Sequence, residues 1–316
     1  MNNIDLSIYV PTYNHEKYIK KALDSIFEQK TNFNFEVLVG EDCSTDTTRK
    51  ILEEYEIEHK DYVESGKLKV FYRESNMYYK VPDNATDLKK RSKGRYIIAL
   101  EGDDYWLDDK KIEKQISFLD ANPDFIAVSH NCKVVNEFGS AINETYPECK
   151  DNEYSFYHYM SNILPGQLTT LMYRNIYVNP NFDCEFLMKG LSPGDRLIVL
   201  FLLCHGRIYC IQECMSAYRH VTSHGDSFSA NYKYNFKDAV NFYKEILFYL
   251  KTKVPSKAEY GEDLYFRIIM KGIKDKDCTL KEAIALTEIL EHRFCVLRNW
   301  IVYIVRKRIL HKKIWV

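Results

Sequence analysis

The chain has 316 residues, of which 46% are hydrophobic and 28% charged, a composition typical of a globular protein with one large domain and an appendage, or with two domains. Its formal net charge of -1 at pH 7 gives no global reason to expect a nucleic-acid partner, because such binding needs a basic surface and the total charge is balanced. The nine cysteines are scattered, odd in number and without a C-x-x-C pair, which argues against a zinc ribbon or a disulfide scaffold and favours a reducing cytoplasm.

The first half of the chain alternates short β-rich runs with helical patterns. We expect strands at 6–10, 35–42, 67–73, 95–104 and 125–130. Apolar side chains recur at helical spacing in the segments 15–29, 46–58 and 109–122. Ser44 or Thr45 is expected to cap the second helix, and Asp108 or Asp109 the third. This alternation predicts an α/β fold with a mixed, mostly parallel central sheet flanked by helices.

The second half is more mixed. The segment 167–174 is strand-like, 194–206 is helical and 207–220 is expected to form two short strands. From about residue 231 the pattern is helical to the end of the chain. We therefore expect a first domain at 1–230 and an α-helical C-terminal region at 231–316.

Three polar clusters follow predicted strands: "PTYN" at 11–14, "GEDCS" at 40–44 and "EGDD" at 101–104. Ligands of such sheets bind beyond the carboxyl ends of the strands, so we expect the clusters to meet at one edge. Asp103 and Asp104 would repel each other there unless a cation, a ligand or open water compensates them. They suit Mg²⁺ or Mn²⁺ completed by phosphate oxygens, and the alternative is a simple turn.

The other two clusters leave more than one interpretation open. Glu41 and Asp42 could accept hydrogen bonds from a base or from ribose hydroxyls, or could cap the helix that follows. Tyr13 fits a stacking surface or a core position equally well.

Together, "VPTYN", "VLVGEDCSTDTT" and "GRYIIALEGDDYWLDDKK" resemble the family 2 glycosyltransferases and their GT-A fold, over roughly residues 4–230. The form "ALEGDDYW" is most similar to bacterial enzymes that build surface polysaccharides. The resemblance implies a Rossmann-like domain that binds a nucleoside-diphosphate sugar, and a divalent metal, Mn²⁺ or Mg²⁺.

Carried over residue by residue, the resemblance implies that Asp42 reads the base, usually uracil, and that Asp103 binds the metal. Glu101 replaces the first aspartate of the family's D-x-D motif, so contact with ribose, or with the metal through water, is expected for it. Asp104 is expected to orient the loop. The remaining members of the expected nucleotide-sugar site, with Thr12 and Tyr13 bordering the base, are Pro11, Thr12, Tyr13, Asn14, Glu41, Arg73 and Gly102.

Two further segments complete the expected site. An inverting transferase needs a base for the acceptor hydroxyl, and Asp195, at the start of an apolar helix, stands where related sequences carry an acidic residue. Helix capping is the alternative role for Asp195. "YRHVTSH" resembles a segment that closes over the sugar donor: Arg219 and His220 are expected at the diphosphate and His224 at the metal.

The C-terminal 25 residues alternate apolar and basic side chains and end near Trp315. Such a helix suits an anionic membrane surface or contact with another subunit, including a second copy of the chain, and both remain open. We find no signal peptide and no window of 18 uncharged apolar residues. The prediction is a cytoplasmic protein that can associate peripherally with the membrane.

The sequence thus predicts a metal-dependent, inverting glycosyltransferase that uses a nucleoside-diphosphate sugar, UDP-linked by resemblance, and a glycan or lipid-linked acceptor. Two alternatives remain. One is a non-catalytic module that binds nucleotide-sugar or glycan, or that scaffolds a membrane complex. The other is a metal-dependent nucleotidyltransferase, for which the N-terminus lacks the usual phosphate loop rich in glycine and lysine.

Overall fold

The computed structural model describes residues 4–78, 80–221, 234–293, 295–298 and 300–301. The chain divides into two compact units. The first comprises Met1–Ser155 and Leu164–Asn231, and the second comprises Phe156–Ile163 and Tyr232–Val316. The second unit thus takes a short segment from the middle of the chain, which no local pattern in the sequence indicated.

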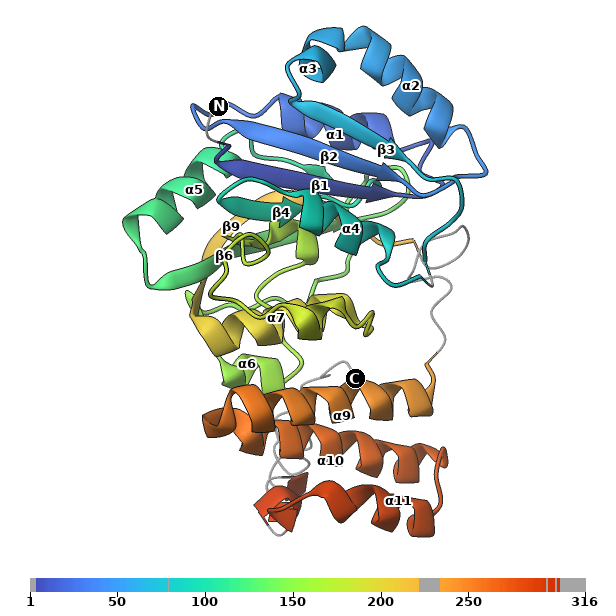
Figure 1. The fold of residues 1–316 in the computed structure, drawn as a ribbon, viewed down its shortest axis with the longest axis vertical. Coiled ribbons are helices and arrows are strands. Elements are labelled where there is room, and N and C mark those ends of the chain that lie inside the picture. The colour runs from blue at the N-terminus through green and yellow to red at the C-terminus, as the bar shows by residue number, and fades with distance from the viewer. Residues whose placement is uncertain (1–3, 79, 222–233, 294, 299, 302–316) are drawn as a thin grey trace. The chain divides into compact units, whose positions relative to one another are not determined.

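The first unit is built on one sheet with helices on both faces (Figure 1). The strand order is β3-β2-β1-β4-β8-β6-β9-β5, and β7 pairs with β9. Strands β1 to β4 are parallel, and antiparallel pairs enter at β8, β5 and β7. This confirms the predicted α/β architecture with a mostly parallel core. The strands are β1 (Leu6–Thr12), β2 (Phe35–Glu41), β3 (Leu68–Tyr72), β4 (Tyr96–Ala99), β5 (Tyr105–Trp106), β6 (Phe125–Val135), β7 (Glu153–Tyr154), β8 (Met172–Arg174) and β9 (Arg207–Arg219).

The helices of this unit connect or follow those strands. Its α-helices are α1 (Ile19–Phe27), α2 (Thr48–Glu58), α3 (Lys60–Glu64), α4 (Asn84–Arg91), α5 (Lys111–Ala121) and α7 (Gly194–His205). Two short 3-10 turns, η1 (Leu168–Thr170) and η2 (Glu185–Met188), lie beside β8 and before α7.

Side-chain alternation along β1 decides which face each helix covers. Ile8 and Val10 are fully buried in a core that includes Leu23 of α1 and Ile116 of α5. Burying such aliphatic side chains contributes about 1.5–3 kcal/mol each. Tyr9 points to the opposite face, where the ammonium group of Lys89 from α4 lies 5.4 Å from its ring centroid. The sheet is therefore covered on both faces, and the loops at its edge are free to form a site.

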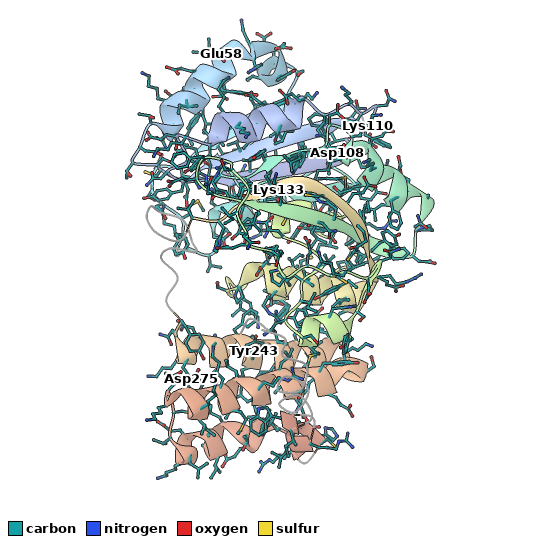
Figure 2. The ribbon with its side chains drawn as sticks, turned by 180° about the vertical axis from the view of Figure 1, so that it is seen from behind. Glu58, Asp108, Lys110, Lys133, Tyr243 and Asp275 are labelled. Atoms are coloured by element: carbon teal, nitrogen blue, oxygen red, sulfur yellow. The ribbon has the colours of Figure 1, made fainter. Side chains whose placement is uncertain are left out.

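The structure corrects several sequence-based expectations. The segment 207–220 forms one strand, β9, whose pairing with β6 shifts register near His130, where two strands were expected. The predicted fourth strand ends at Ala99, and the acidic segment after it is a turn. Neither Asp108 nor Asp109 caps α5, whose N-cap is Lys110. Asp108 instead accepts a hydrogen bond from the backbone N–H of Lys110 at 2.7 Å. Figure 2 labels both residues in the loop that leads into α5.

The second unit is helical. Its elements are α6 (Phe156–Met160), α9 (Phe236–Lys253), η3 (Pro255–Lys257), α10 (Ala258–Asp275), α11 (Leu280–Leu286) and η4 (Thr287–Ile289). Its core includes Leu247 of α9 and Ile269 of α10. None of the helices in the described part of the chain has the length and apolar character needed to cross a membrane. The basic tail at 302–316 lies outside the described residues.

Candidate active site

The three polar clusters converge because the strands that precede them are parallel neighbours. Thr12 pairs with Glu41, and Glu41 pairs with Tyr72, so β1, β2 and β3 end at the same level. The backbone N–H of Asp42 donates to the carbonyl of Thr12 at 3.0 Å, and that of Gly102 to the carbonyl of Pro11 at 3.2 Å. The sheet thus brings the predicted loops together at one edge, as its topology requires.

The loop after β1 is held by a side chain that the sequence assigned to the ligand. Asn14 has a left-handed backbone, with φ of 54°. Its amide oxygen accepts from the N–H of Thr45 at 2.8 Å, and its own N–H donates to the hydroxyl of Ser44 at 3.0 Å. The prediction that Ser44 or Thr45 caps α2 is wrong, because the N-cap is Thr47, whose side chain makes no capping hydrogen bond to the helix. The neighbouring Tyr13 is partly exposed.

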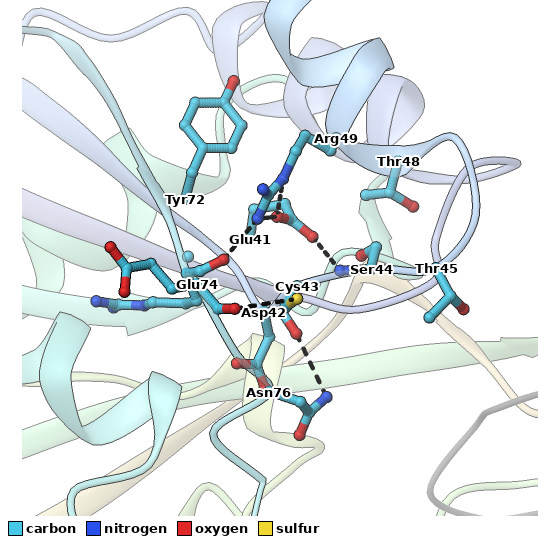
Figure 3. A network of polar contacts seen from close by, with 12 residues as sticks. Glu41, Asp42, Cys43, Ser44, Thr45, Thr48, Arg49, Tyr72, Glu74 and Asn76 are labelled. Carbon is cyan, nitrogen blue, oxygen red and sulfur yellow. Dashed lines mark hydrogen bonds and ion pairs between the residues drawn. The ribbon is translucent and has the colours of Figure 1, made fainter.

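Figure 3 shows how the loop after β2 is fixed. Glu41 is fully buried, and both carboxylate oxygens are engaged. Oε1 accepts from the N–H of Ser44 at 2.6 Å, and Oε2 accepts from Nε of Arg49 at 2.7 Å. Arg49 also donates through Nη2 to the carbonyl of Arg73 at 2.7 Å, which connects this loop to the end of β3. Glu41 therefore holds the loop that carries Asp42.

Asp42 is buried beside Glu41, and one of its oxygens accepts from the N–H of Met77 at 2.8 Å. Burial raises the pKa of Asp42 above its ordinary value, against the opposing effect of the Met77 hydrogen bond. Its carbonyl accepts from the side-chain amide of Asn76 at 3.3 Å (Figure 3). The segment after β3 thus forms the wall beside the predicted base-reading carboxylate.

Arg73 points toward α4. Its Nε donates to Oδ1 of Asn84 at 3.0 Å, and its Nη2 donates to Asp87 at 2.6 Å. Asn84 in turn donates to the carbonyl of Gly40 at 2.8 Å, where an added Cβ would lie 2.3 Å from the Asn84 side chain. The guanidinium of Arg73 therefore joins β2 and β3 to α4.

The turn after β4 gathers three carboxylates. Ligand oxygens of Glu101, Asp103 and Asp104 lie within 4.8 Å of one another. Burial, together with the charges of Asp103 and Asp195, raises the pKa of Glu101 to about 8. Burial and the charges of Asp103 and Glu101 raise the pKa of Asp104 well above its ordinary value. Burial and mutual repulsion thus both oppose ionisation of these carboxylates.

The cluster fits a divalent metal ion on two observations. Asp104 accepts the N–H of Arg219 at 2.7 Å through Oδ1, while its Oδ2 is buried without a hydrogen-bond partner within the described ranges. Carboxylate oxygens at this spacing are the ligands that Mg²⁺ and Mn²⁺ prefer. A cation would also relieve the repulsion that raises these pKa values.

Arg219, at the end of β9, binds the acidic turn through both its backbone and its side chain. Its Nε donates to the carbonyl of Asp103 at 2.8 Å, and Nη1 donates to those of Asn136 and Glu137 at 2.8 and 2.7 Å. The guanidinium also lies 4.2 Å from the ring centroid of Tyr18. It therefore ties the acidic turn to the loop after β6.

Of the two histidines that follow Arg219, the structure describes only His220. His220 lies 2.6 Å from Glu144 through Nδ1, and its ring stacks on Tyr218 with centroids 5.8 Å apart. His224, the predicted metal ligand, lies outside the described residues.

Asp195 occupies the first turn of α7 without capping it. The N-cap is Pro193, and Oδ1 of Asp195 accepts a hydrogen bond from the backbone N–H of Arg196 at 2.7 Å. Burial raises the pKa of Asp195. Its charge raises the pKa of Glu101, which places it close enough to act on the acidic cluster. The first unit therefore places Asp195, on a helix some 90 residues further along the chain, within electrostatic range of Glu101.

Sequence reasoning missed residues that complete this site. Arg49 is the partner of buried Glu41, and Gln167 donates to Glu101 at 3.4 Å. His15 lies 3.9 Å from Asp103. Only His15 carried a local signal, since it directly follows "PTYN"; the other two come from helical or loop segments with no distinguishing pattern.

Known proteins share the fold and the sequence family of this chain. The fold is similar to that of TarS from Staphylococcus aureus, solved as residues 1–349 in complex with UDP-GlcNAc: the TM-score is 0.60 at 19% identity, over 92% of this chain and 78% of that one. This is the GT-A fold. The family model Glycosyl transferase family 2 matches residues 7–176, so the chain belongs to glycosyl transferase family 2.

Two curated relatives show the range of the similarity. The chain is 30% identical over 215 residues to the uncharacterized protein Rv1520 of Mycobacterium tuberculosis, a match that covers 68% of this chain and 58% of that protein. It is 30% identical over 198 residues to the Escherichia coli UDP-Glc:alpha-D-GlcNAc-diphosphoundecaprenol beta-1,3-glucosyltransferase WfgD, covering 60% of this chain and 67% of WfgD. The match thus spans little more than half the length of the first of these relatives.

Proposed function

We propose that the protein is a metal-dependent, inverting glycosyltransferase. It transfers a sugar from a nucleoside-diphosphate sugar, preferentially a UDP-sugar, to a glycan or lipid-linked acceptor in the synthesis of a cell-surface polysaccharide. The observation that carries the proposal is the partly buried cluster of Glu101, Asp103 and Asp104, with Asp195 acting on it electrostatically. Membership of family 2 supports the reaction type.

The residues divide into those that touch the nucleotide-sugar and those that position them. Asp42 accepts from the base, and Tyr13 offers a ring face for stacking. Asp103 is the principal metal ligand, with Glu101 beside it. The metal, Mn²⁺ or Mg²⁺, supplies neutralisation of the diphosphate leaving group when bound. The positioning residues are Asn14, Glu41, Arg73, Asp104 and Arg219, whose polar atoms hold neighbouring loops.

Asp195 is the proposed base. A carboxylate whose pKa is raised by burial accepts a proton more readily at neutral pH than an exposed one does. It takes the proton of the acceptor hydroxyl as that oxygen attacks the anomeric carbon from the face opposite the diphosphate. The bond from the anomeric carbon to the diphosphate breaks, and the configuration is inverted.

The relatives support the finer choices of donor and acceptor. TarS was solved with UDP-GlcNAc, and the name of WfgD specifies a UDP-glucose donor and a diphosphoundecaprenol-linked acceptor. A lipid-linked acceptor would place this protein at the cytoplasmic face of the membrane, and the C-terminal helices would contact either the membrane surface or a second copy of the chain. In the same proposal, residues 1–230 form the catalytic domain, and the helical region 231–316 attaches the protein to the membrane or to another subunit.

Calorimetric titration tests the proposal. The wild-type protein is titrated with UDP, GDP and their sugar conjugates, with Mn²⁺ and then with EDTA. We expect one nucleotide series to bind only with metal, and Asp103→Asn to abolish that binding. Asp124→Asn is the matched control, because Asp124 is an exposed carboxylate outside the acidic cluster. Absence of nucleotide binding by wild type under both conditions would refute the enzyme and favour a scaffold.

A further inference from the structure

His15 lies at the acidic cluster in a fixed orientation. Its backbone N–H donates to the hydroxyl of Thr48 at 2.8 Å, and its carbonyl accepts from the N–H groups of Tyr18 and Ile19, both at 2.9 Å, where α1 begins. Its Nδ1 lies 3.1 Å from Oγ1 of Thr12. Backbone and ring are therefore held by β1, α1 and α2 together.

Gly102 leaves the space in which this ring sits. A Cβ at Gly102 would lie 2.6 Å from Oγ1 of Thr12 and 2.7 Å from Nδ1 of His15. Any side chain at Gly102 would therefore clash with the imidazole of His15. The packing brings Nε2 of His15 to 3.9 Å from Oδ2 of Asp103.

The partner of Nδ1 determines where the imidazole carries a proton. Thr12 is buried, and Nδ1 of His15 is the acceptor within reach of its hydroxyl in the described part of the chain. A buried hydroxyl hydrogen needs an acceptor, so Thr12 donates to Nδ1. The proton of the neutral ring then lies on Nε2. Nε2–H is therefore a hydrogen-bond donor directed at the acidic cluster.

The distance shows that this donor is not used by Asp103 itself. At 3.9 Å, Nε2 and Oδ2 are too far apart for a hydrogen bond. An N–H on Nε2 also cannot coordinate a metal, which requires the lone pair of that nitrogen. What suits the position is an anionic oxygen lying next to Asp103.

We propose that Nε2–H of His15 donates a hydrogen bond to a diphosphate oxygen of the nucleotide, at the phosphate beyond the one attached to ribose. This rests on the proposed function, since Asp103 would hold the metal that the same phosphate contacts. His15 is thereby a binding residue for the leaving group, and Thr12 is the positioning residue that orients its ring.

Three substitutions separate this role from a structural one. His15→Asn keeps a polar atom where Nδ1 lies and can still accept from Thr12, but it loses the donor at Nε2. His15→Gln places an amide N–H near the position of Nε2. His15→Ala removes both. Affinities for UDP and UMP, or for the corresponding pair of whichever nucleotide wild type binds, are measured by calorimetry with Mg²⁺, and folding is checked by circular dichroism.

We expect His15→Asn and His15→Ala to weaken UDP binding by about 10- to 100-fold, the range of one hydrogen bond to a charged group. UMP binding should change by less than about twofold, since the missing contact is to the second phosphate. His15→Gln should recover most of the UDP affinity. Inorganic pyrophosphate, titrated in parallel, should lose affinity in His15→Asn as UDP does.

The outcomes are distinct. Unchanged UDP affinity in a folded His15→Asn protein overturns the role of His15 and leaves the proposed function intact. Equal losses for UDP and UMP overturn it as well, because they indicate a general distortion of the site. If the wild-type protein binds no nucleotide, the proposed function is refuted, and the proposed role of His15, which depends on it, is refuted as well.

Discussion

The ion pair between Glu41 and Arg49 gives an asymmetric prediction, because its two members differ in exposure. The Glu41 side chain is fully buried, whereas that of Arg49 is 38% exposed. In Glu41→Gln the stranded guanidinium can be hydrated, and the Ser44 N–H retains an amide oxygen as acceptor. This variant loses one charge-assisted hydrogen bond, which solvent already weakens. We expect its free energy of unfolding to fall by about 2 kcal/mol.

In Arg49→Met the partner left behind is a buried carboxylate that water does not reach. Breaking a buried pair in this direction costs about 3–5 kcal/mol. The double variant removes both charges, so it should be destabilised by only about 2 kcal/mol, close to Glu41→Gln alone.

Urea unfolding measures these differences. Replacing Trp300 and Trp315 by Phe leaves Trp106, which is buried in the first unit, as the fluorescent reporter in every variant. Lys69→Met, which removes the half-exposed partner of the buried Glu36, provides a comparison pair of similar exposure at the adjoining strands. The reasoning is refuted if Arg49→Met is no more destabilising than Glu41→Gln, or if the double variant is the least stable of the three.

Three further outcomes follow from the site. Asp195→Asn should bind the nucleotide-sugar as wild type does but release UDP from it at least about 100-fold more slowly, and unchanged release would remove Asp195 from the mechanism. Burial opposes ionisation of Asp87, but hydrogen bonds from Arg91 and Arg73 outweigh this effect and lower the pKa of Asp87. Ionised Asp87 therefore contributes fully to stability above the ordinary pKa of an aspartate, and this contribution is lost as the pH falls through the lowered pKa. The stability gap between wild type and Asp87→Asn, followed by thermal unfolding, should therefore shrink below about pH 4, and a gap that widens there would contradict the assignment. Gly102→Ala places a methyl group 2.6 Å from Oγ1 of Thr12, and we expect a loss of about 1–3 kcal/mol with weaker nucleotide binding; calorimetry showing wild-type affinity would mean that the turn can relax.

The candidate site shows where residue type is a sound guide and where it is not. The acidic turn at Glu101, Asp103 and Asp104 follows a buried strand, and charge in that position has few explanations other than a ligand. Arginine carries no such information, because its long side chain reaches partners in any direction. Arg73 and Arg219 were both assigned to the nucleotide from resemblance, and the structure directs them to α4 and to backbone carbonyls.

Local pattern also failed at the helix starts. The hydroxyl and carboxyl groups of Ser44, Thr45, Asp108 and Asp109 stand where caps are expected, but α2 and α5 begin without side-chain capping bonds. Ser44 and Thr45 bind Asn14 instead, some 30 residues away in the sequence. A capping residue offers one or two hydrogen bonds, and a tertiary partner at the same position competes for them.

The sequence by itself determined the order of strands β1 to β4 and of helices α1, α2 and α5, together with the edge at which the site forms. Both are set by short-range properties: apolar periodicity fixes the type of element, and parallel strands present their carboxyl ends on one side. Only the tertiary structure decided which polar groups are already engaged and which face the site. Arg219 and Asp104, 115 residues apart, or His15 and Asp103, meet through packing of separate elements. The burial that raises the pKa of Glu101 and Asp195 likewise exists only once those elements have packed, so no local pattern could carry it.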